Sequence, residues 1–370
     1  MRIGITCYPT YGGSGIVATE LGLELANRGH EIHFITYANP IRLDPGTPRI
    51  HYHEVEVSNY PLFQYPPYCL ALASRMYEVA ERQALDLLHV HYAIPHSISA
   101  LLAQQMSQRR LPFITTLHGT DITLVGADPS YFPITRFSIE RSDAVTTISE
   151  YMRRRTGEFF HTGKQIEVIH NFVNCVTYRP DPEAQAHGKR IMHISNFRPV
   201  KRVNDCIRAF ALVRREVEAE LVMAGDGPDR GPAEALAREL GVEDAVIFLG
   251  KQDHVERLIP RMHALHLPSE LESFGLAALE AMACGVVPVA TRTGGLPELV
   301  TDGHDGFLED VGDIQRHAQR LIEILTDDKL RSQMSAAARN TAETRFCTDL
   351  LIPRYEAVYR NVLAATSPAL

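Results

Sequence analysis

One pattern of hydrophobic and polar positions repeats along the whole chain. Short apolar, β-prone runs alternate with longer stretches whose apolar residues recur every three or four positions. The first repeat is a strand at residues 3–6, a turn-rich loop at residues 9–15 and an amphipathic helix at residues 16–28. Gly29 follows as the stop signal of that helix. This order of strand, glycine-rich loop and helix predicts a parallel sheet covered by helices.

The repeats fall into two consecutive series, and the second begins near Asn171. The first series predicts further strands at residues 31–37, 86–91, 113–118 and 144–148, helices at residues 74–83 and 96–108, a cap at Ser149, and an irregular excursion at residues 42–67. The second predicts strands at residues 190–195, 220–224, 246–250, 264–268 and 286–290, and helices at residues 203–216, 232–240, 255–262, 313–325, 328–344 and 350–362. A length of 370 residues suits about two domains. We therefore expect an α/β protein with two doubly wound, Rossmann-like domains.

Two glutamates, Glu272 and Glu280, are separated by seven residues in the stretch from Ser269 to Ala290. We expect a loop that turns into a helix at about Phe274, with Glu272 on the loop and Glu280 about two turns into the helix. The first N–H groups of this helix have no partner inside it, and their partial positive charge suits a phosphate. The stretch could therefore hold a phosphate and offer two acceptors to sugar hydroxyls. A plain surface helix with solvated glutamates fits the spacing equally well.

Two basic residues, Arg198 and Lys201, follow the first strand of the second series. Two cations on one strand-end loop can reach both phosphates of a diphosphate through charge-assisted hydrogen bonds, although solvated surface charges are the alternative. Ligands of open parallel sheets bind beyond the carboxyl ends of the strands. We therefore expect the glycine loop and the loops at His118, Ser195 and Glu272 to converge on one cleft.

The glycine loop resembles a dinucleotide-binding pattern only in part. Residues 13–18 read GSGIVA, which matches the pattern with alanine in the last place. The second strand of such a site ends in an acid that binds the ribose hydroxyls, whereas residues 36–39 read TYAN. The missing acid argues against a nicotinamide dinucleotide. It leaves the helix start available to a phosphate or a carboxylate.

Histidines gather in the first series at His89, His91 and His96, with only Asp86 as a nearby acid. We expect packed or hydrogen-bonded histidines there rather than metal ligands. His118 differs because it ends a strand at the expected cleft, where its ring can hydrogen-bond a substrate hydroxyl.

An arginine and several hydroxyls of the first series could bind a small carboxylate. These residues are scattered in the sequence, and most fall at or near strand ends. Arg136 could equally form an i,i+4 ion pair with Glu140. The candidates are Ser14, Tyr92, Thr116 and Arg136.

Composition excludes several classes of protein. A hydrophobic fraction of 45% and a charged fraction of 22% are those of an ordinary globular chain. The net charge of -8 argues against nucleic acid or an anionic membrane as a partner. No apolar run approaches the length of a membrane span, and Met1-Arg2 leads directly into a strand, so neither a span nor a signal peptide is expected. Six scattered cysteines indicate reduced thiols of a cytoplasmic protein rather than disulfides or a zinc site.

With these residues in view, the chain resembles a retaining family 4 glycosyltransferase with the two-domain GT-B fold. The sequence from Glu272 to Glu280 resembles the paired-glutamate motif of that family, Arg198 and Lys201 its diphosphate-binding pair, and Gly13 its donor-side glycine loop. The likeness runs from about residue 2 to residue 363. Three long segments, YPTYGGSGIVATELGLELANRGHEIHF, HVHYAIPH and TTLHGTDITLVG, resemble the members that act in bacillithiol biosynthesis.

The resemblance implies a UDP-N-acetylglucosamine donor and an L-malate acceptor, joined with retention at the anomeric carbon in the first step of bacillithiol biosynthesis. It implies that Glu280 holds the uridine ribose, that Glu272 holds the sugar hydroxyls, and that neither is a nucleophile. It implies no cofactor and no metal. The residues carried over are His118, Arg198, Lys201 and Glu272 for catalysis; Gly13, Gly15, Arg198, Lys201, Glu272, Phe274, Gly275, Leu276 and Glu280 for the donor; and Ser14, Tyr92, Thr116 and Arg136 for the acceptor.

The resemblance also divides the chain. An acceptor-binding domain would comprise residues 1–169 with residues 350–370, and a nucleotide-sugar-binding domain residues 170–349, with closure on the donor and a possible homo-oligomer. Three alternatives stay open: a family member with another acceptor such as an inositol phosphate, a UDP-sugar 2-epimerase on the same fold, and a non-catalytic sugar-nucleotide-binding protein.

Overall fold

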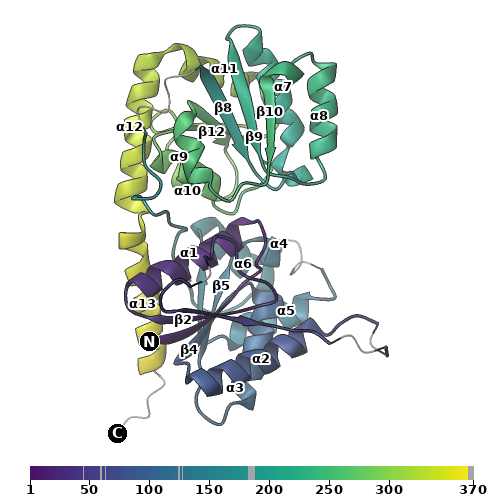
Figure 1. Cartoon of the computed structure of the whole chain (residues 1–370), viewed down its shortest axis with the longest axis vertical. Helices are drawn as coiled ribbons and strands as arrows, with labels where there is room; N and C mark the ends of the chain where they lie inside the picture. Colours follow the sequence, from purple (N-terminus) through teal and green to yellow (C-terminus); the bar gives the residue numbers. More distant parts are fainter. Residues whose placement is uncertain are drawn as a thin grey trace. The chain divides into compact units, whose positions relative to one another are not determined.

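The structure of the chain is a computed structural model that describes residues 1–44, 46–58, 61–62, 64–123, 126, 128–181 and 188–365. It divides into two compact units (Figure 1). The first comprises residues 1–170 and residues 351 onward, and the second comprises residues 171–350. Leu124 and Val125, at the end of the third quoted segment, lie outside the described residues.

A parallel sheet forms the centre of the first unit. Its described strands lie in the order β3-β2-β1-β4-β5-β6-β7, and each neighbouring pair is parallel. The strands are β1 Arg2–Thr6, β2 Glu31–Thr36, β3 Ile50–Glu54, β4 Leu87–His91, β5 Phe113–Leu117, β6 Ala144–Thr147 and β7 Ile166–Val168. The helices are α1 Gly13–Asn27, α2 Tyr68–Gln83, α3 Ile98–Met106, α4 Thr120–Thr123, α5 Phe132–Arg141, α6 Glu150–Phe160 and α13 Thr348–Ala364, with a π-helical turn η1 at Ala93–Ser97.

Side chains that alternate along the strands cover both faces of this sheet. Leu88 and Val90 of β4 pack with α2 and α3 in one core cluster. His89, between them, points to the other face, where its ring bonds the Tyr359 hydroxyl of α13. The predicted ends of two helices are confirmed: Gly29 follows α1 with φ +92°, and the Ser149 hydroxyl accepts the Met152 N–H at the start of α6.

The second unit repeats the plan with a smaller sheet. Its described strands lie in the order β10-β9-β8-β11-β12-β13, again with parallel neighbours. The strands are β8 Lys189–Ile194, β9 Ala219–Ala224, β10 Val246–Gly250, β11 Ala264–Leu267, β12 Val287–Thr291 and β13 Phe307–Glu309. The helices are α7 Val203–Arg214, α8 Arg230–Glu239, α9 Leu276–Ala283, α10 Leu296–Leu299, α11 Ile314–Thr326 and α12 Asp328–Arg345, with 3-10 turns η2 Pro199–Lys201, η3 Glu243–Ala245, η4 Val255–Arg257 and η5 Ile259–Arg261. One core cluster joins this sheet to α7, α8, α11 and α12.

Two predictions from the hydrophobic pattern are wrong. Residues 255–262 form two separate 3-10 turns instead of a helix, because Pro260 has no N–H to continue one. The irregular excursion at residues 42–67 contains β3, an edge strand whose residues are mostly exposed, so its apolar signal is weak. Among the described residues, no helix combines the length and apolar character needed to cross a membrane.

Candidate functional site

Two loops of the second unit meet because the strands that precede them, β8 and β11, are neighbours in the sheet. The Lys201 ammonium after β8 lies 2.6 Å from the Glu272 carboxylate after β11. The Ser269 hydroxyl donates to the same Glu272 oxygen at 2.8 Å, and a backbone bond of 2.8 Å from the Glu270 N–H to Val200 joins the two loops. The expectation that loops at the ends of neighbouring strands converge is therefore confirmed for these two loops. Two residues predicted to bind the sugar-nucleotide donor, Lys201 and Glu272, form an ion pair with each other.

Arg198 precedes Lys201 by three residues in the same loop and is exposed. Within the described part of the chain, its side chain has no hydrogen bond or ion pair. The neighbouring Arg202 differs, because its guanidinium lies 2.6 Å from the carboxylate of Asp205. Arg198 is thus the cation of this loop that is available to an anion, and charge-assisted bonds from an arginine fork suit a phosphate.

A glycine pair that the motif analysis missed holds the Glu272 loop in place. The Gly295 N–H donates to the Glu272 carbonyl at 2.9 Å. Gly294 has φ +59°, and a Cβ added there would lie 1.8 Å from the same carbonyl oxygen. Only a residue without a Cβ fits this close approach. The GG dipeptide in the turn after β12 was the available signal in the sequence.

Helix α9 begins two residues later than predicted. Its first residue is Leu276, after Gly275 at φ +99°, whereas the hydrophobic pattern predicted a start at about Phe274. Gly275 has a left-handed backbone, so the helical geometry of α9 does not extend back beyond Leu276. A Cβ at Gly275 would lie 2.6 Å from the Leu296 side chain. The Phe274 side chain is buried against the Phe346 ring, with centroids 5.6 Å apart. Phe274 is therefore a core residue, and only its backbone is available to a donor.

Glu280 lies in the second turn of α9 and is buried. The Tyr178 hydroxyl donates to Glu280 Oε1 at 2.8 Å. Tyr178 was missed in the sequence because it lies 102 residues away in the chain and belongs to no motif. The contact fixes one carboxylate oxygen of a residue predicted to hold the ribose.

In the first unit, Gly13 and Ser14 form the first turn of α1. Gly15 has no room for a side chain, since a Cβ there would lie 2.5 Å from the Tyr8 carbonyl oxygen and 2.9 Å from that of Thr10. Gly12 is the N-cap residue and, as a glycine, has no side chain that could cap the helix. The chain before α1 therefore passes close over the helix start, which is the arrangement that a glycine loop permits.

His89, His91 and His96 are buried and hydrogen-bonded, so the packed interpretation of these three histidines is confirmed. His89 bonds the hydroxyls of Tyr359 and Thr116 at 2.8 and 2.7 Å, and His91 bonds His118 Nε2 at 2.8 Å. His96 Nδ1 bonds the His91 carbonyl.

These contacts enclose two residues that were predicted to bind substrate. Thr116 is fully buried, and its hydroxyl also bonds Thr146 at 2.6 Å. His118 is 6% exposed. The structure thus leaves the Thr116 side chain no open face toward an acceptor, which counts against its predicted contact.

Tyr92 and Arg136 are more open. The Tyr92 backbone has φ +90°, its hydroxyl lies 2.6 Å from that of Thr120, and its ring stacks on His118 with centroids 5.7 Å apart. The Arg136 guanidinium lies 2.9 Å from the Glu140 carboxylate, which is the i,i+4 pair that was the alternative for this residue. The acceptor roles of these residues stay predictions.

The buried histidines predict a loss of stability in mild acid. Burial lowers the pKa of His89 to about 3, of His96 to about 4 and of His118 to about 3. In the unfolded chain these groups titrate near pH 6.5, so below that pH the unfolded state binds protons that the folded state does not. We expect the free energy of unfolding in urea to fall between pH 6.5 and 4, by up to about 1.4 kcal/mol per pH unit for each histidine.

One variant checks the source of that slope. His89→Gln should reduce it by about one proton. Equal slopes in His89→Gln and the parent would show that the buried histidine is not responsible.

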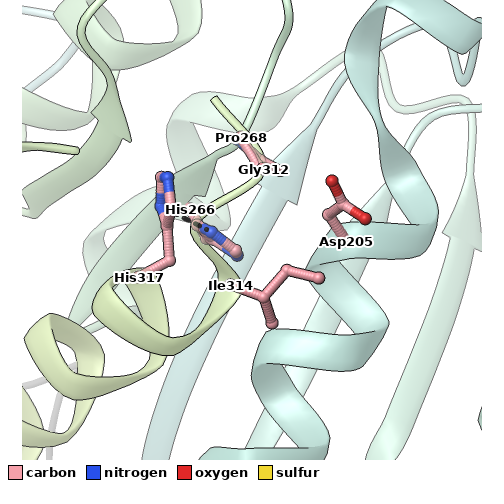
Figure 2. Close-up of a pocket in the computed structure, with 6 residues that line it drawn as sticks. All are labelled: Asp205, His266, Pro268, Gly312, Ile314 and His317. Atoms are coloured by element: carbon pink, nitrogen blue, oxygen red, sulfur yellow. Dashed lines mark hydrogen bonds between the residues drawn. The ribbon is translucent and has the colours of Figure 1, made fainter. Parts of the chain in front are cut away.

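A small pocket of the second unit is lined by Asp205, His266, Pro268, Gly312, Ile314 and His317. Its volume of about 160 Å³ includes open solvent and is still less than a sugar nucleotide requires. Figure 2 shows the rings of His266 and His317 turned toward each other, joined by a hydrogen bond of 3.2 Å. Burial lowers the pKa of both rings. No predicted site residue lines this pocket.

The two Rossmann-like units make up the GT-B fold that the sequence predicted. Two solved structures share this fold at 20% sequence identity. Sucrose-phosphate synthase from Thermosynechococcus elongatus superposes with a TM-score of 0.82 over 99% of this chain and 100% of that one. Anabaena Alr3699/HepE in complex with UDP and glucose superposes with a TM-score of 0.80 over 97% and 99%.

Sequence comparisons narrow the class. The model of glycosyl transferases group 1 matches residues 177–341, and that of Glycosyltransferase Family 4 matches residues 11–176. An N-acetyl-alpha-D-glucosaminyl L-malate synthase from Bacillus anthracis is 48% identical over 98% of this chain and 97% of its own length. The chain therefore belongs to the family 4 glycosyltransferases, as the motifs predicted.

Proposed function

We propose that this enzyme transfers N-acetylglucosamine from UDP-N-acetylglucosamine to the hydroxyl of L-malate, with retention at the anomeric carbon, as the first step of bacillithiol biosynthesis. The observation that carries the proposal is the 48% identity, over 98% of the chain, to a synthase of N-acetyl-alpha-D-glucosaminyl L-malate. The alignment includes both loops of the candidate donor site and all the candidate acceptor residues.

The free guanidinium of Arg198 supports a diphosphate donor. In this proposal Arg198 and Lys201 bind the diphosphate, and the backbone N–H groups at Gly275 and Leu276 bind it at the start of α9. Cations and oriented N–H groups stabilise the charge that develops as the diphosphate leaves, and such electrostatic terms are the largest in many enzymes. Lys201 and Glu272 form an ion pair, so the two side chains lie together. This supports the proposal that they bind adjacent parts of one donor, Lys201 the diphosphate and Glu272 the sugar.

The proposed reaction takes place on one face of the sugar. The malate hydroxyl oxygen bonds to the anomeric carbon, the bond from that carbon to the β-phosphate oxygen breaks, and this phosphate oxygen takes the hydroxyl proton. Glu272 orients the sugar and Glu280 the ribose, and neither forms a covalent bond. Burial and the bond from Tyr178 support a positioning role for Glu280.

Arg136 is the proposed partner of a malate carboxylate. Its present partner, Glu140, belongs to the same helix, and both side chains are substantially exposed. Such i,i+4 surface pairs contribute only about 0.3–0.5 kcal/mol, so exchange for a bound carboxylate costs little. Ser14 at the start of α1 and the Tyr92 hydroxyl complete the proposed acceptor set. Gly13 and Gly15 supply backbone for close approach on the donor side.

A transfer assay without metal tests the proposal. The protein, UDP-N-acetylglucosamine and L-malate in EDTA should give UDP and a glycoside whose anomeric proton has the α coupling. Malate should outcompete an inositol phosphate at equal concentration. UDP-N-acetylmannosamine formed without acceptor would indicate an epimerase, and UDP binding without any transfer a non-catalytic protein. Activity restored only by a divalent cation would contradict metal independence.

A cytoplasmic location belongs to the same proposal. It is supported by the state of the cysteines, all six of which are free thiols.

A further inference from the structure

Two segments that connect the units meet at one backbone bridge inside the second unit. The chain leaves the first unit after His170 and returns to it at Leu351. Between these points, Val173 and Cys347 pair in parallel. The Val173 N–H donates to the Phe346 carbonyl at 3.0 Å, and the Thr348 N–H donates to the Val173 carbonyl at 3.1 Å. This bridge fixes the segment at residues 173–175 beside the start of α13.

Two cysteines, Cys175 and Cys347, lie at this bridge. Cys347 immediately precedes α13, and its sulfur lies within hydrogen-bonding reach of the Cys175 side chain and of the N–H groups of Cys175 and Asp349. The Cys175 thiol donates to the Val173 carbonyl at 3.8 Å. Cys175 is buried, whereas Cys347 is partly exposed. Cys347 is thus partly accessible to solvent and has donors beside its sulfur, whereas Cys175 is buried.

The hydrogen bonds shift the pKa values of the two thiols in opposite directions. The hydrogen bond with the Cys175 side chain, followed by the two backbone N–H groups, lowers the pKa of Cys347 to about 6, against the opposing effects of burial and of the Asp349 charge. The same bond, together with burial, raises the pKa of Cys175. Arg339 and Glu343 of α12 face Cys175 with opposite effects, and the Arg339 guanidinium bonds the Cys175 carbonyl at 2.9 Å.

The other cysteines lack these features. Cys7, Cys206 and Cys284 are buried, and burial raises the pKa of each thiol. Cys69 is partly exposed like Cys347, yet burial of its sulfur raises its pKa as well. Low pKa, access to solvent and an adjacent second thiol are the features of redox-responsive cysteines. They coincide only at Cys347 among these thiols.

We propose that Cys347 and Cys175 are a reversible redox site, in which a peroxide oxidises the Cys347 thiolate and Cys175 then closes a disulfide. In the first step the thiolate attacks the peroxide, the O–O bond breaks, and Cys347 becomes a sulfenic acid while hydroxide, or an alkoxide from an organic peroxide, leaves. In the second step the Cys175 sulfur attacks the Cys347 sulfur, and water leaves. Two thiols and hydrogen peroxide thus give one disulfide and two waters, and a dithiol reductant restores the thiols.

The disulfide would join the two connections that bracket the second unit. Cys175 lies four residues after Asn171, the first residue of the second unit. Cys347 lies four residues before Leu351, where the chain returns to the first unit. The site is connected to one candidate donor residue, because the Arg339 guanidinium bonds the carbonyls of both Cys175 and Tyr178, and the Tyr178 hydroxyl bonds Glu280. The redox chemistry itself does not depend on which acceptor the enzyme uses.

Mass spectrometry of the intact protein tests the site. After brief treatment with hydrogen peroxide, the parent should be two hydrogen atoms lighter than the untreated protein. After alkylation of the remaining thiols, digestion should give one peptide pair linked through Cys175 and Cys347. Cys175→Ser should instead trap a sulfenic acid at Cys347 with dimedone, and Cys347→Ser should leave Cys175 unmodified. Dithiothreitol should reverse the parent reaction. An unlinked parent, or trapping at Cys175 rather than Cys347, would overturn the proposal.

Alkylation rates separate an activated thiol from one that is merely accessible. In Cys175→Ser the serine hydroxyl keeps a donor beside Cys347, so the reduced protein should alkylate at Cys347 on the order of tenfold or more faster than at Cys69 at pH 7. In the parent, the Cys347 rate should level off above about pH 6, whereas the Cys69 rate should still rise through pH 9. Parallel pH profiles for the two cysteines, with equal rates, would refute the activation of Cys347.

Discussion

An Arg198→Ala enzyme should transfer sugar on the order of 10²- to 10³-fold more slowly than the parent at saturating substrate, with unchanged thermal stability. The loss is expected in kcat because the guanidinium would act on charge that grows as the diphosphate departs. Stability should hold because Arg198 is exposed and its side chain has no partner in the described structure. Few substitutions offer so clear a separation of chemistry from folding.

Arg202→Ala is the matched control, because it removes the same charge four positions along the same connection. Its guanidinium is already paired with Asp205, so transfer should stay within about threefold of the parent. Steady-state kinetics and a thermal melt of both variants decide the matter. If the Arg198→Ala enzyme is as fast as the Arg202→Ala enzyme, Arg198 does not bind the diphosphate as proposed.

Lys201 would give a less clean result, for a structural reason. Its ammonium lies 2.6 Å from Glu272, and both side chains are largely buried. Removing the lysine therefore leaves a carboxylate without its cation, and the Glu272 loop can move. A slow Lys201→Ala enzyme could reflect either a lost phosphate contact or a displaced glutamate, which is why Arg198 is the sharper probe.

The sequence was sufficient for the fold and for the meeting of two loops. Alternation of apolar runs gave two parallel sheets, and the rule that ligands lie at carboxyl ends of strands brought Lys201 to Glu272. Both inferences use only local periodicity and the order of elements. They succeed because a parallel sheet places successive strand ends on one edge whatever the side chains are.

Contacts between distant segments could not be predicted in this way. Tyr178 reaches Glu280 across 102 residues, and no periodicity connects them. The burial of Thr116 depends on His89, whose other ring nitrogen bonds Tyr359 in the last helix. The pattern of β5 shows two alternating faces, but it does not show that α13, far along the chain, covers the face on which Thr116 lies.

Replacement of Gly294 by alanine should abolish most activity, although this glycine belongs to none of the predicted site residues. A Cβ there would lie 1.8 Å from the Glu272 carbonyl oxygen and 2.9 Å from its carbon, so the Glu272 loop must shift. A displacement of about 1 Å at a positioned group can cost on the order of 10²-fold in rate. We expect transfer to fall by at least that factor, with the binding of UDP less affected, as measured by kinetics and calorimetry.

Gly303→Ala separates the clash from backbone strain. Gly303 has φ +74°, close to the φ +59° of Gly294, but a Cβ there would meet nothing within 4 Å. Both variants carry the cost of a left-handed alanine, about 1–2 kcal/mol, so any difference between them comes from the contact with Glu272. Gly303→Ala should keep near-parent transfer in the same assay. If Gly294→Ala is as active as Gly303→Ala, the Glu272 loop tolerates displacement, and the ion pair with Lys201 is not what positions the sugar.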